Sequence, residues 1–184
     1  NEVFTVTNTG GSTSGTLTTT LGGGSATEFE KISDTCHGQT LAAAAACTVV
    51  VRLTPSARGS RPGSRTVAGT PGGTAQSSLS GTGLALASLS VTPTTQDFGI
   101  LTTGTTTTRS FTVRNEGDQS TGSLAVAATG ADFSVVAPST CAGVTLAGGA
   151  PCTVTVQFAP TTSGAKTGPL GVTASPGRTA PAPP

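Results

Sequence analysis

The 184-residue chain carries nine Lys and Arg against eight Asp and Glu, so its net charge of +1 excludes an electrostatic footprint for nucleic acid or for an anionic membrane. Charged residues make up 9% of the chain, against roughly 25% in ordinary globular domains, and the aromatic 3% is all phenylalanine. No apolar run reaches the ~18 residues of a membrane span. No signal peptide precedes the first predicted strand, so we interpret the sequence as a mature product or as a window on a longer protein.

Short segments of alternating apolar and polar residues follow one another along the chain. Phe4 and Val6 alternate with threonines, and every second residue is apolar at 47–53 and at 152–158. A period of two with one apolar face predicts half-buried strands. Turn signals such as "NTGGSTSG" and "TPSARGSRPG" separate them, and no ten-residue helix is predicted. The pattern therefore predicts an all-β sandwich.

The same segments occur twice, which indicates a tandem repeat. "FTVTNTG" at 4–10 returns as "FTVRNEG" at 111–117, and "CTVVVRLTPSARGSRPG" at 47–63 returns as "CTVTVQFAPTTSGAKTG" at 152–168. The second spacing is two residues shorter than the first, so the first copy holds an insertion, which we place at Gly22–Gly24.

A run of five alanines lies within "TLAAAAACT" at 40–48 and aligns with "TLAGGAPCT" at 145–153. Alanine favours helix, but two glycines and a proline in the second copy would break one. We therefore predict a turn or short connector before a strand, with a helical turn as the alternative.

Each repeat contains two cysteines, and both pairs have the same spacing. An even number at a recurring spacing predicts two local disulfides, Cys36–Cys47 and Cys141–Cys152, and hence an oxidising compartment. Zinc is the rival interpretation, with free thiols as a third. The chain has no C-x-x-C pair, and Ala142 stands where the first repeat has His37, which argues against a metal site.

No residue pattern in the sequence indicates a catalytic site. His37 is the single histidine and lies beside a predicted disulfide, so we expect a solvated loop residue. Glu28 and Glu30 flank Phe29 and are expected to be solvated, and no acid pair recurs in both repeats. We therefore predict no enzymatic activity, no cofactor and no bound metal.

Other binding chemistries lack their usual residues. Without Trp or Tyr, glycan recognition and base stacking have no stacking platforms, so we predict no nucleic-acid partner and disfavour glycans. Arg58, Arg61 and Arg65 form the one basic cluster and are expected to be solvated loop residues. Arg65 aligns with the inward Leu170, so either its strand is an edge that lets Arg65 reach water or the alignment is off by one.

Two stretches resemble bacterial hydin/abnormal-spindle-type immunoglobulin-like domains, including those of choice-of-anchor proteins. They are "LSVTPTTQDFGILTTGTTTTRSFTVRNEG" at 89–117 and the "C…LAxGAxCTVTVxFxPTxxG" pattern at 141–164. The resemblance implies two tandem immunoglobulin-like β-sandwiches, and its motifs are structural ones. We place repeat 1 at 1–84 without its first strand, a short apolar linker at 85–88, and repeat 2 at 89–184 without its last strand.

These features predict a non-enzymatic structural module outside the cell or at its surface: a stalk, a spacer or a filament subunit of a bacterial surface protein. The alternative function is an adhesin or ligand-binding module. Expected partners are neighbouring immunoglobulin-like domains or identical chains. The missing strands either lie outside a window on a longer array or are supplied by these partners through strand addition.

Overall fold

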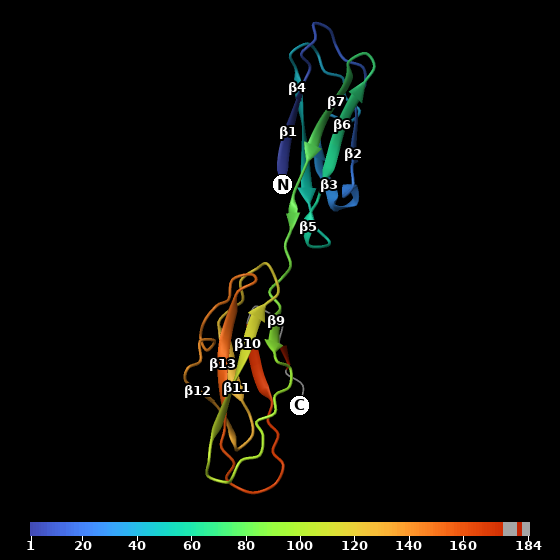
Figure 1. Ribbon diagram of the computed structural model, residues 1–184. Coiled ribbons are helices and arrows are strands. Elements are labelled where there is room, and N and C mark those ends of the chain that lie inside the picture. Colours follow the sequence, from blue (N-terminus) through green and yellow to red (C-terminus); the bar gives the residue numbers. More distant parts are fainter. Residues whose placement is uncertain (175–179, 182–184) are drawn as a thin grey trace. The chain divides into compact units, whose positions relative to one another are not determined.

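The computed structural model describes residues 1–174 and 180–181, and the chain divides into two compact units, Asn1–Gly83 and Leu84–Pro184 (Figure 1). Within the described residues, the regular structure consists of β-strands and one 3-10 turn, η1 (Ala26–Glu28), which confirms the all-β prediction. No helix in this part of the chain is long and apolar enough to cross a membrane.

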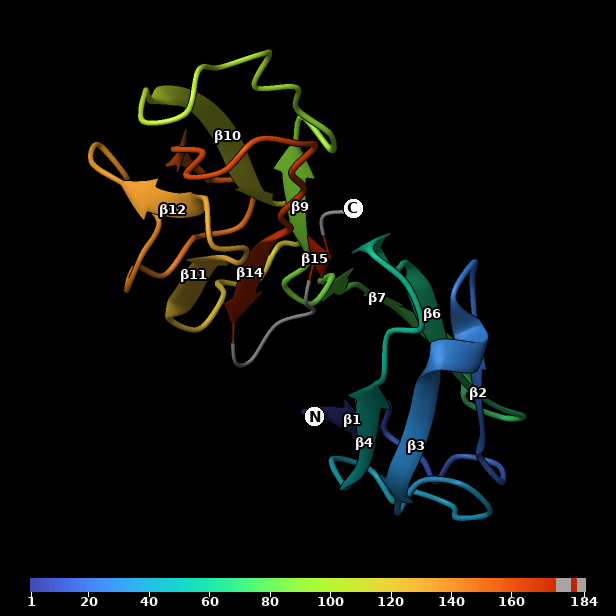
Figure 2. The same ribbon diagram turned by 90° about the horizontal axis from the view of Figure 1, so that it is seen from below.

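Unit 1 contains eight strands in two three-stranded sheets and one two-stranded sheet. The strands are β1 (Glu2–Thr7), β2 (Thr18–Gly22), β3 (Phe29–Asp34), β4 (Ala46–Leu53), β5 (Gly59–Ser60), β6 (Gly63–Gly69), β7 (Gly73–Leu79) and β8 (Thr82–Gly83). The sheet orders are β1-β4-β3, β2-β6-β7 and β5-β8, and β1, β4 and β3 are visible side by side in Figure 2. Alternation in β4 buries Cys47, Val49 and Val51, which join Val67 of β6 in one core cluster.

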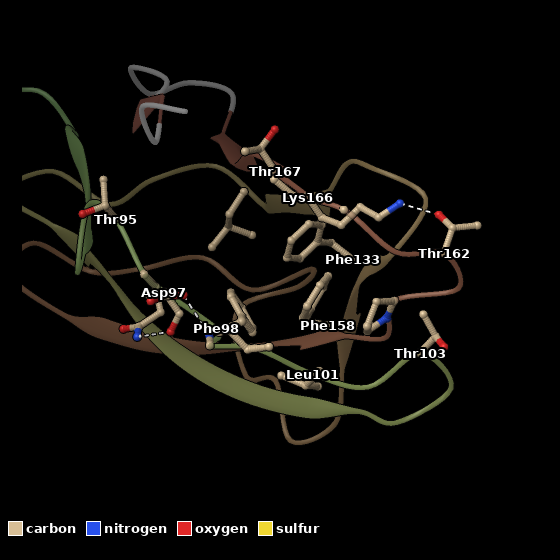
Figure 3. A pocket seen from close by; sticks show the side chains of 18 of the residues that line it. Thr95, Asp97, Phe98, Leu101, Thr103, Phe133, Phe158, Thr162, Lys166 and Thr167 are labelled. Carbon is tan, nitrogen blue, oxygen red and sulfur yellow. Dashed lines mark hydrogen bonds between the residues drawn. The ribbon is translucent and has the colours of Figure 1, made fainter.

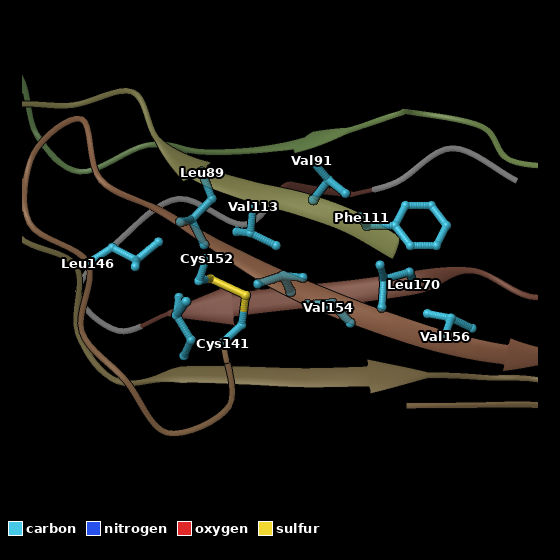
Figure 4. Packing of buried hydrophobic residues seen from close by; sticks show 12 residues of the cluster. Leu89, Val91, Phe111, Val113, Cys141, Leu146, Cys152, Val154, Val156 and Leu170 are labelled. Atoms are coloured by element: carbon cyan, nitrogen blue, oxygen red, sulfur yellow. A yellow bond between two sulfur atoms is a disulfide. The ribbon is translucent and has the colours of Figure 1, made fainter. Parts of the chain in front are cut away.

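The described part of unit 2 contains seven strands in two sheets. The strands are β9 (Leu89–Thr92), β10 (Thr107–Asn115), β11 (Leu124–Ala128), β12 (Phe133–Val136), β13 (Pro151–Phe158), β14 (Leu170–Ala174) and β15 (Ala180–Pro181). The orders are β12-β13-β10-β9 and β11-β14-β15. Val113 of β10, Val154 of β13 and Val172 of β14 are fully buried in a core that draws on both sheets (Figure 4).

Two strand pairings have the same register in the two units. Phe4 lies opposite Val49 in unit 1, and Phe111 lies opposite Val154 in unit 2. In the second sheet, β2 pairs with β6 as β11 pairs with β14. The aligned sequence segments therefore occupy equivalent strands, because equal register puts the same positions on the core face.

The run of alanines is a turn, as predicted. Ala45 donates its backbone N–H to the carbonyl of Ala42 at 3.0 Å, and Ala44 has a left-handed φ of 62°. The equivalent Gly149 has a φ of 73°. Left-handed backbone favours glycine, so the second repeat has the better residue for this turn.

Residues 85–88, predicted as a linker, are hydrogen-bonded into unit 2. The backbone N–H of Ala85 donates to Asp118 Oδ2 at 2.9 Å, and the carbonyl of Ser88 accepts from the N–H of Glu116 at 2.7 Å. The boundary between the compact units lies before this segment, between Gly83 and Leu84.

At the place where repeat 2 is predicted to lack its last strand, the structure has the short strand β15. β15 pairs with β14 through Gly171 opposite Pro181 and Val172 opposite Ala180, in the position that β7 has beside β6. The rest of the tail, 175–179 and 182–184, lies outside the described residues. In unit 1, β1 pairs with β4 alone among the described strands.

Candidate functional site

A disulfide lies in the core of each unit. The bonds are Cys36–Cys47 and Cys141–Cys152, with Cα atoms 5.2 Å apart in both. Cys36 and Cys141 are fully buried, and no cysteine is free. Each bond ties a loop to the start of a central strand, β4 or β13, as the spacing of the cysteines predicts. Among the described residues, no group of three or more His, Cys, Asp or Glu side chains could hold a metal ion.

A buried polar network in unit 1 joins β2, β3 and the disulfide loop. Lys31 Nζ donates to Asp34 Oδ2 at 2.9 Å and to the Thr19 hydroxyl at 2.9 Å, and that hydroxyl also donates to Asp34 Oδ2. Asp34 Oδ1 accepts from the backbone N–H groups of Cys36 and His37. The side chain of Asp34 is 12% exposed, and that of Lys31 is 29% exposed.

The electrostatics of this network fix the charge of Asp34. Burial raises the pKa of this carboxyl, but the hydrogen bonds from Thr19, Lys31 and the two backbone N–H groups outweigh it and lower the pKa to about 2. A carboxylate with so low a pKa is a weak base near neutral pH. Thr19 is only 4% exposed, so its hydroxyl is inaccessible to a substrate. The network is therefore suited to holding strands together rather than to catalysis.

Arg65 is buried, which contradicts both sequence interpretations of this residue. Its strand β6 lies between β2 and β7, and the side chain is 8% exposed. The guanidinium carbon lies 4.5 Å from the centroid of the Phe4 ring, and Nε donates to Ser77 Oγ at 3.2 Å. The alignment with Leu170 is correct, and a cation–π contact partly replaces the hydration that Arg65 loses.

An acid, a hydroxyl and a cation recur together in both units. In unit 1 the Ser56 hydroxyl donates to Glu28, and Arg61 Nε lies 3.5 Å from Glu28 Oε2. Glu28 is therefore paired, and its side chain is only 10% exposed. The prediction that Glu28 is solvated is wrong. The bond from Ser56 lowers the pKa of Glu28, and the charge of Arg61 acts in the same direction.

The counterpart in unit 2 uses Asp132, Thr161 and Lys166. The backbone N–H and hydroxyl of Thr161 donate to Asp132 Oδ1 at 3.0 and 2.9 Å, and Lys166 Nζ lies 3.3 Å from Asp132 Oδ2. These bonds lower the pKa of Asp132, chiefly the bond from the Thr161 backbone. Neither cluster was predicted from the sequence, although the aligned positions of their members were a usable signal.

A hollow of about 910 Å³ lies beside three phenylalanines in unit 2 (Figure 3). The rings of Phe133 and Phe158 stack with centroids 4.8 Å apart, and Phe98 meets both rings edge-on. Two polar lining groups are already bonded: Asp97 Oδ1 accepts from the N–H of Gly99, and Lys166 donates to Thr162. The remaining surface suits an apolar group.

A second hollow, of about 400 Å³, lies in unit 1 next to β1. Phe4, Phe29, Val51, Leu53 and Leu79 provide its apolar lining. Phe29 lies opposite Leu53 as Phe133 lies opposite Phe158 in unit 2, so the two hollows occupy equivalent places.

Comparison with known proteins gives a family match and several similar solved structures. The family model described as HYDIN/CFA65/VesB-like, Ig-like domain matches residues 87–178. A protein of unknown function from Porphyromonas gingivalis W83 has 14% identity and a TM-score of 0.38, with 94% of this chain and 83% of that chain covered.

Another similar structure is the secreted serine protease VesC from Vibrio cholerae, with 16% identity and a TM-score of 0.35. The match covers 96% of this chain and 47% of that chain, so the chain spans about half the length of VesC. No curated protein matches the sequence.

Proposed function

The chain belongs to the HYDIN/CFA65/VesB-like Ig-like domain family by the match at residues 87–178, and we propose that it is a non-enzymatic structural module of a bacterial extracellular protein. In this proposal both units are immunoglobulin-like β-sandwiches arranged in tandem, and the module is a spacer or filament subunit at the cell surface.

The observation that carries the proposal is the same buried disulfide at the same place in both units. A cross-link stabilises chiefly by restricting the unfolded chain, by about 3 kcal/mol for a loop of this size. Such bonds form and persist in oxidising compartments, which supports a location outside the cytoplasm. The buried charges of Asp34, Glu28 and Asp132 are bonded within the units, as expected of groups that stabilise a fold.

Two measurements test this function. Alkylation of the native protein without reduction, followed by mass spectrometry, should leave all four cysteines unmodified. In single-molecule pulling, eleven residues extend to about 38 Å whereas the bonded Cα atoms are 5.2 Å apart, so reduction should lengthen each unit's unfolding step by about 3 nm. Alkylated thiols in the native protein, or units that extend under load without a discrete step, would contradict a disulfide-locked spacer.

Binding of an apolar ligand is the second candidate function, favoured by the hollow at Phe98, Phe133 and Phe158. Ile100, which lines this hollow, is fully exposed. A fluorescent apolar dye should bind the chain and lose affinity on Phe98→Ala. Equal dye binding by this variant would exclude the hollow as the site.

A further inference from the structure

The outer edge of β1 differs from the equivalent edge in unit 2. β10 pairs with β13 on one side and with β9 on the other, whereas β1 pairs with β4 alone among the described strands. Residues 112–115 of β10 carry the β9 pairing, and residues 5–8 are their counterparts. An edge of unpaired backbone groups is a template for an additional strand.

Core residues next to this edge are less buried in unit 1. Phe111 is 7% exposed, and Val113 is fully buried under β9. Their counterparts Phe4 and Val6 are only half-buried, although they have the same residue types and the same register with β4. The apolar surface that β9 covers in unit 2 thus remains accessible to solvent in unit 1.

The asparagine that follows each of these strands has the corresponding difference. Asn115 Oδ1 accepts from the backbone N–H groups of Gly117 and of Ser88, the residue before β9, both at 3.1 Å. Asn8 Oδ1 accepts from Gly10 at 3.0 Å, and no other described residue donates to it. Asn8 therefore keeps one acceptor position that an incoming backbone N–H could use.

The hollow of unit 1 corresponds to the place that Phe98 occupies within unit 2. In unit 2 the chain continues from β9 to Phe98, whose ring contacts Phe133 and Phe158. The equivalent Phe29 and Leu53 line the 400 Å³ hollow. Beside it, Arg65 Nη1 is a buried donor without an acceptor among the described residues, and its guanidinium stacks on Phe4, which also lines the hollow.

From these four differences we infer that the β1 edge and the unit 1 hollow together form an acceptor site for an extended peptide segment of the kind that unit 2 carries at 88–100. The donor is the leading segment of an immunoglobulin-like repeat with the same pattern, and it lies outside residues 1–184. It adds antiparallel to β1, with its leucine opposite Asn8, its valine opposite Val6, and its phenylalanine in the hollow. The register follows from Leu89 opposite Asn115 and Val91 opposite Val113.

This inference rests on the proposed function, because it takes unit 1 to be an immunoglobulin-like repeat. It specifies the partner as a strand whose alternate apolar side chains enter the core and whose backbone supplies the hydrogen bonds, the mode known as β-augmentation.

The test adds the synthetic peptide SLSVTPTTQDFGI, the sequence of residues 88–100, to the full chain. Hydrogen exchange should show at least about tenfold greater protection of the β1 amides, because those on the outer edge gain a partner. The chain's own β10 amides serve as the internal reference. Two variant peptides, with lysine in place of the valine or alanine in place of the phenylalanine, should lose most of this protection while the chain itself is unchanged.

A matched pair of chain variants locates the site. Val6→Lys puts a charge on the core face of β1 and should abolish peptide binding. Val3→Lys changes a 59% exposed residue on the opposite face of the same strand and should leave it intact. Exchange of the core amides shows whether unit 1 stays folded in the Val6→Lys variant. If unit 1 unfolds, the variant peptides test the site instead.

Several results would overturn the acceptor site: no protection of β1 at millimolar peptide, equal protection by the lysine peptide, or binding at β10 only. Association of the chain with itself through β1, undisturbed by the peptide, would assign the edge to a second copy instead. The alkylation and pulling experiments do not depend on the peptide. If the chain has oxidised cysteines and discrete unfolding steps but does not bind the peptide, the structural role stands and the acceptor site is refuted.

Discussion

Replacing Asp34 by asparagine should destabilise unit 1 and remove a defined part of its pH dependence. The folded pKa of Asp34 is about 2, against an ordinary value of 3.8. A lowered pKa stabilises the folded state above the unfolded pKa, and this contribution is lost as the pH falls through the folded one. At 1.36 kcal/mol per pKa unit, Asp34 contributes on the order of 2 kcal/mol above pH 4, which disappears toward pH 2.

The Asp34→Asn variant keeps the size of the side chain but leaves the ammonium group of Lys31 without its anionic partner at 2.9 Å. We expect a loss of about 2–3 kcal/mol at pH 7, since a broken, largely buried pair costs more than an exposed one. In thermal unfolding this corresponds to a fall of roughly 10 °C for a domain of this size. Urea unfolding between pH 2 and pH 7, followed by the NMR signals of Val49, provides the measurement.

Two controls accompany this experiment. Unit 2 is present in the same molecule, and the signals of Val154 should be unchanged. Glu30→Gln removes a carboxylate from the same strand, but its ion pair with Arg52 is 61% and 50% exposed, so the cost should stay below about 1 kcal/mol. The reasoning would be refuted if Asp34→Asn cost no more than Glu30→Gln, or if the variant lost as much stability as the wild type between pH 4 and pH 2.

Three further predictions concern the core and turns. Serine in place of both cysteines of the unit 1 disulfide should cost about 3 kcal/mol in unit 1 by denaturant titration, and an unchanged midpoint would contradict this. Gly149→Ala should destabilise unit 2 by roughly 1 kcal/mol and Ala44→Gly should stabilise unit 1 by up to ~1 kcal/mol, with opposite shifts in melting temperature, because both positions have left-handed φ. Arg65→Leu, which introduces the residue found at Leu170, should leave unit 1 within about 1 kcal/mol of wild type or more stable, since it removes a desolvated cation. A calorimetric loss above ~2 kcal/mol would mean that the contact with Phe4 outweighs the cost of burial.

Most of the strand pattern and the disulfides could be predicted because they depend on local signals that occur twice. Alternation at 47–53 and 152–158 identifies the central strands, and glycines in the second copy identify the turn hidden by alanines in the first. The acid clusters were missed because their members are polar residues in two segments that lie far apart in the chain. Only the fold brings Glu28, Ser56 and Arg61 together.

Periodicity alone did not predict that Arg65 is buried. The alignment placed it correctly on the core face, but residue type argued that it must reach water. The neighbouring Phe4 ring and the Ser77 hydroxyl make its burial tolerable, and neither is adjacent to it in sequence. A buried polar group depends on its partners, and partners across a sheet are set by packing.

The sequence by itself determined the all-β class, the cysteine pairing and the equivalence of the two repeats, because period-two alternation and equal spacing are properties of the chain alone. The tertiary structure decided which charges are buried and where the hollows lie. These features depend on which strands become neighbours. The same Phe–Thr–Val segment lies beside β9 in unit 2 but pairs with β4 alone among the described strands of unit 1, so its phenylalanine and valine are less buried there.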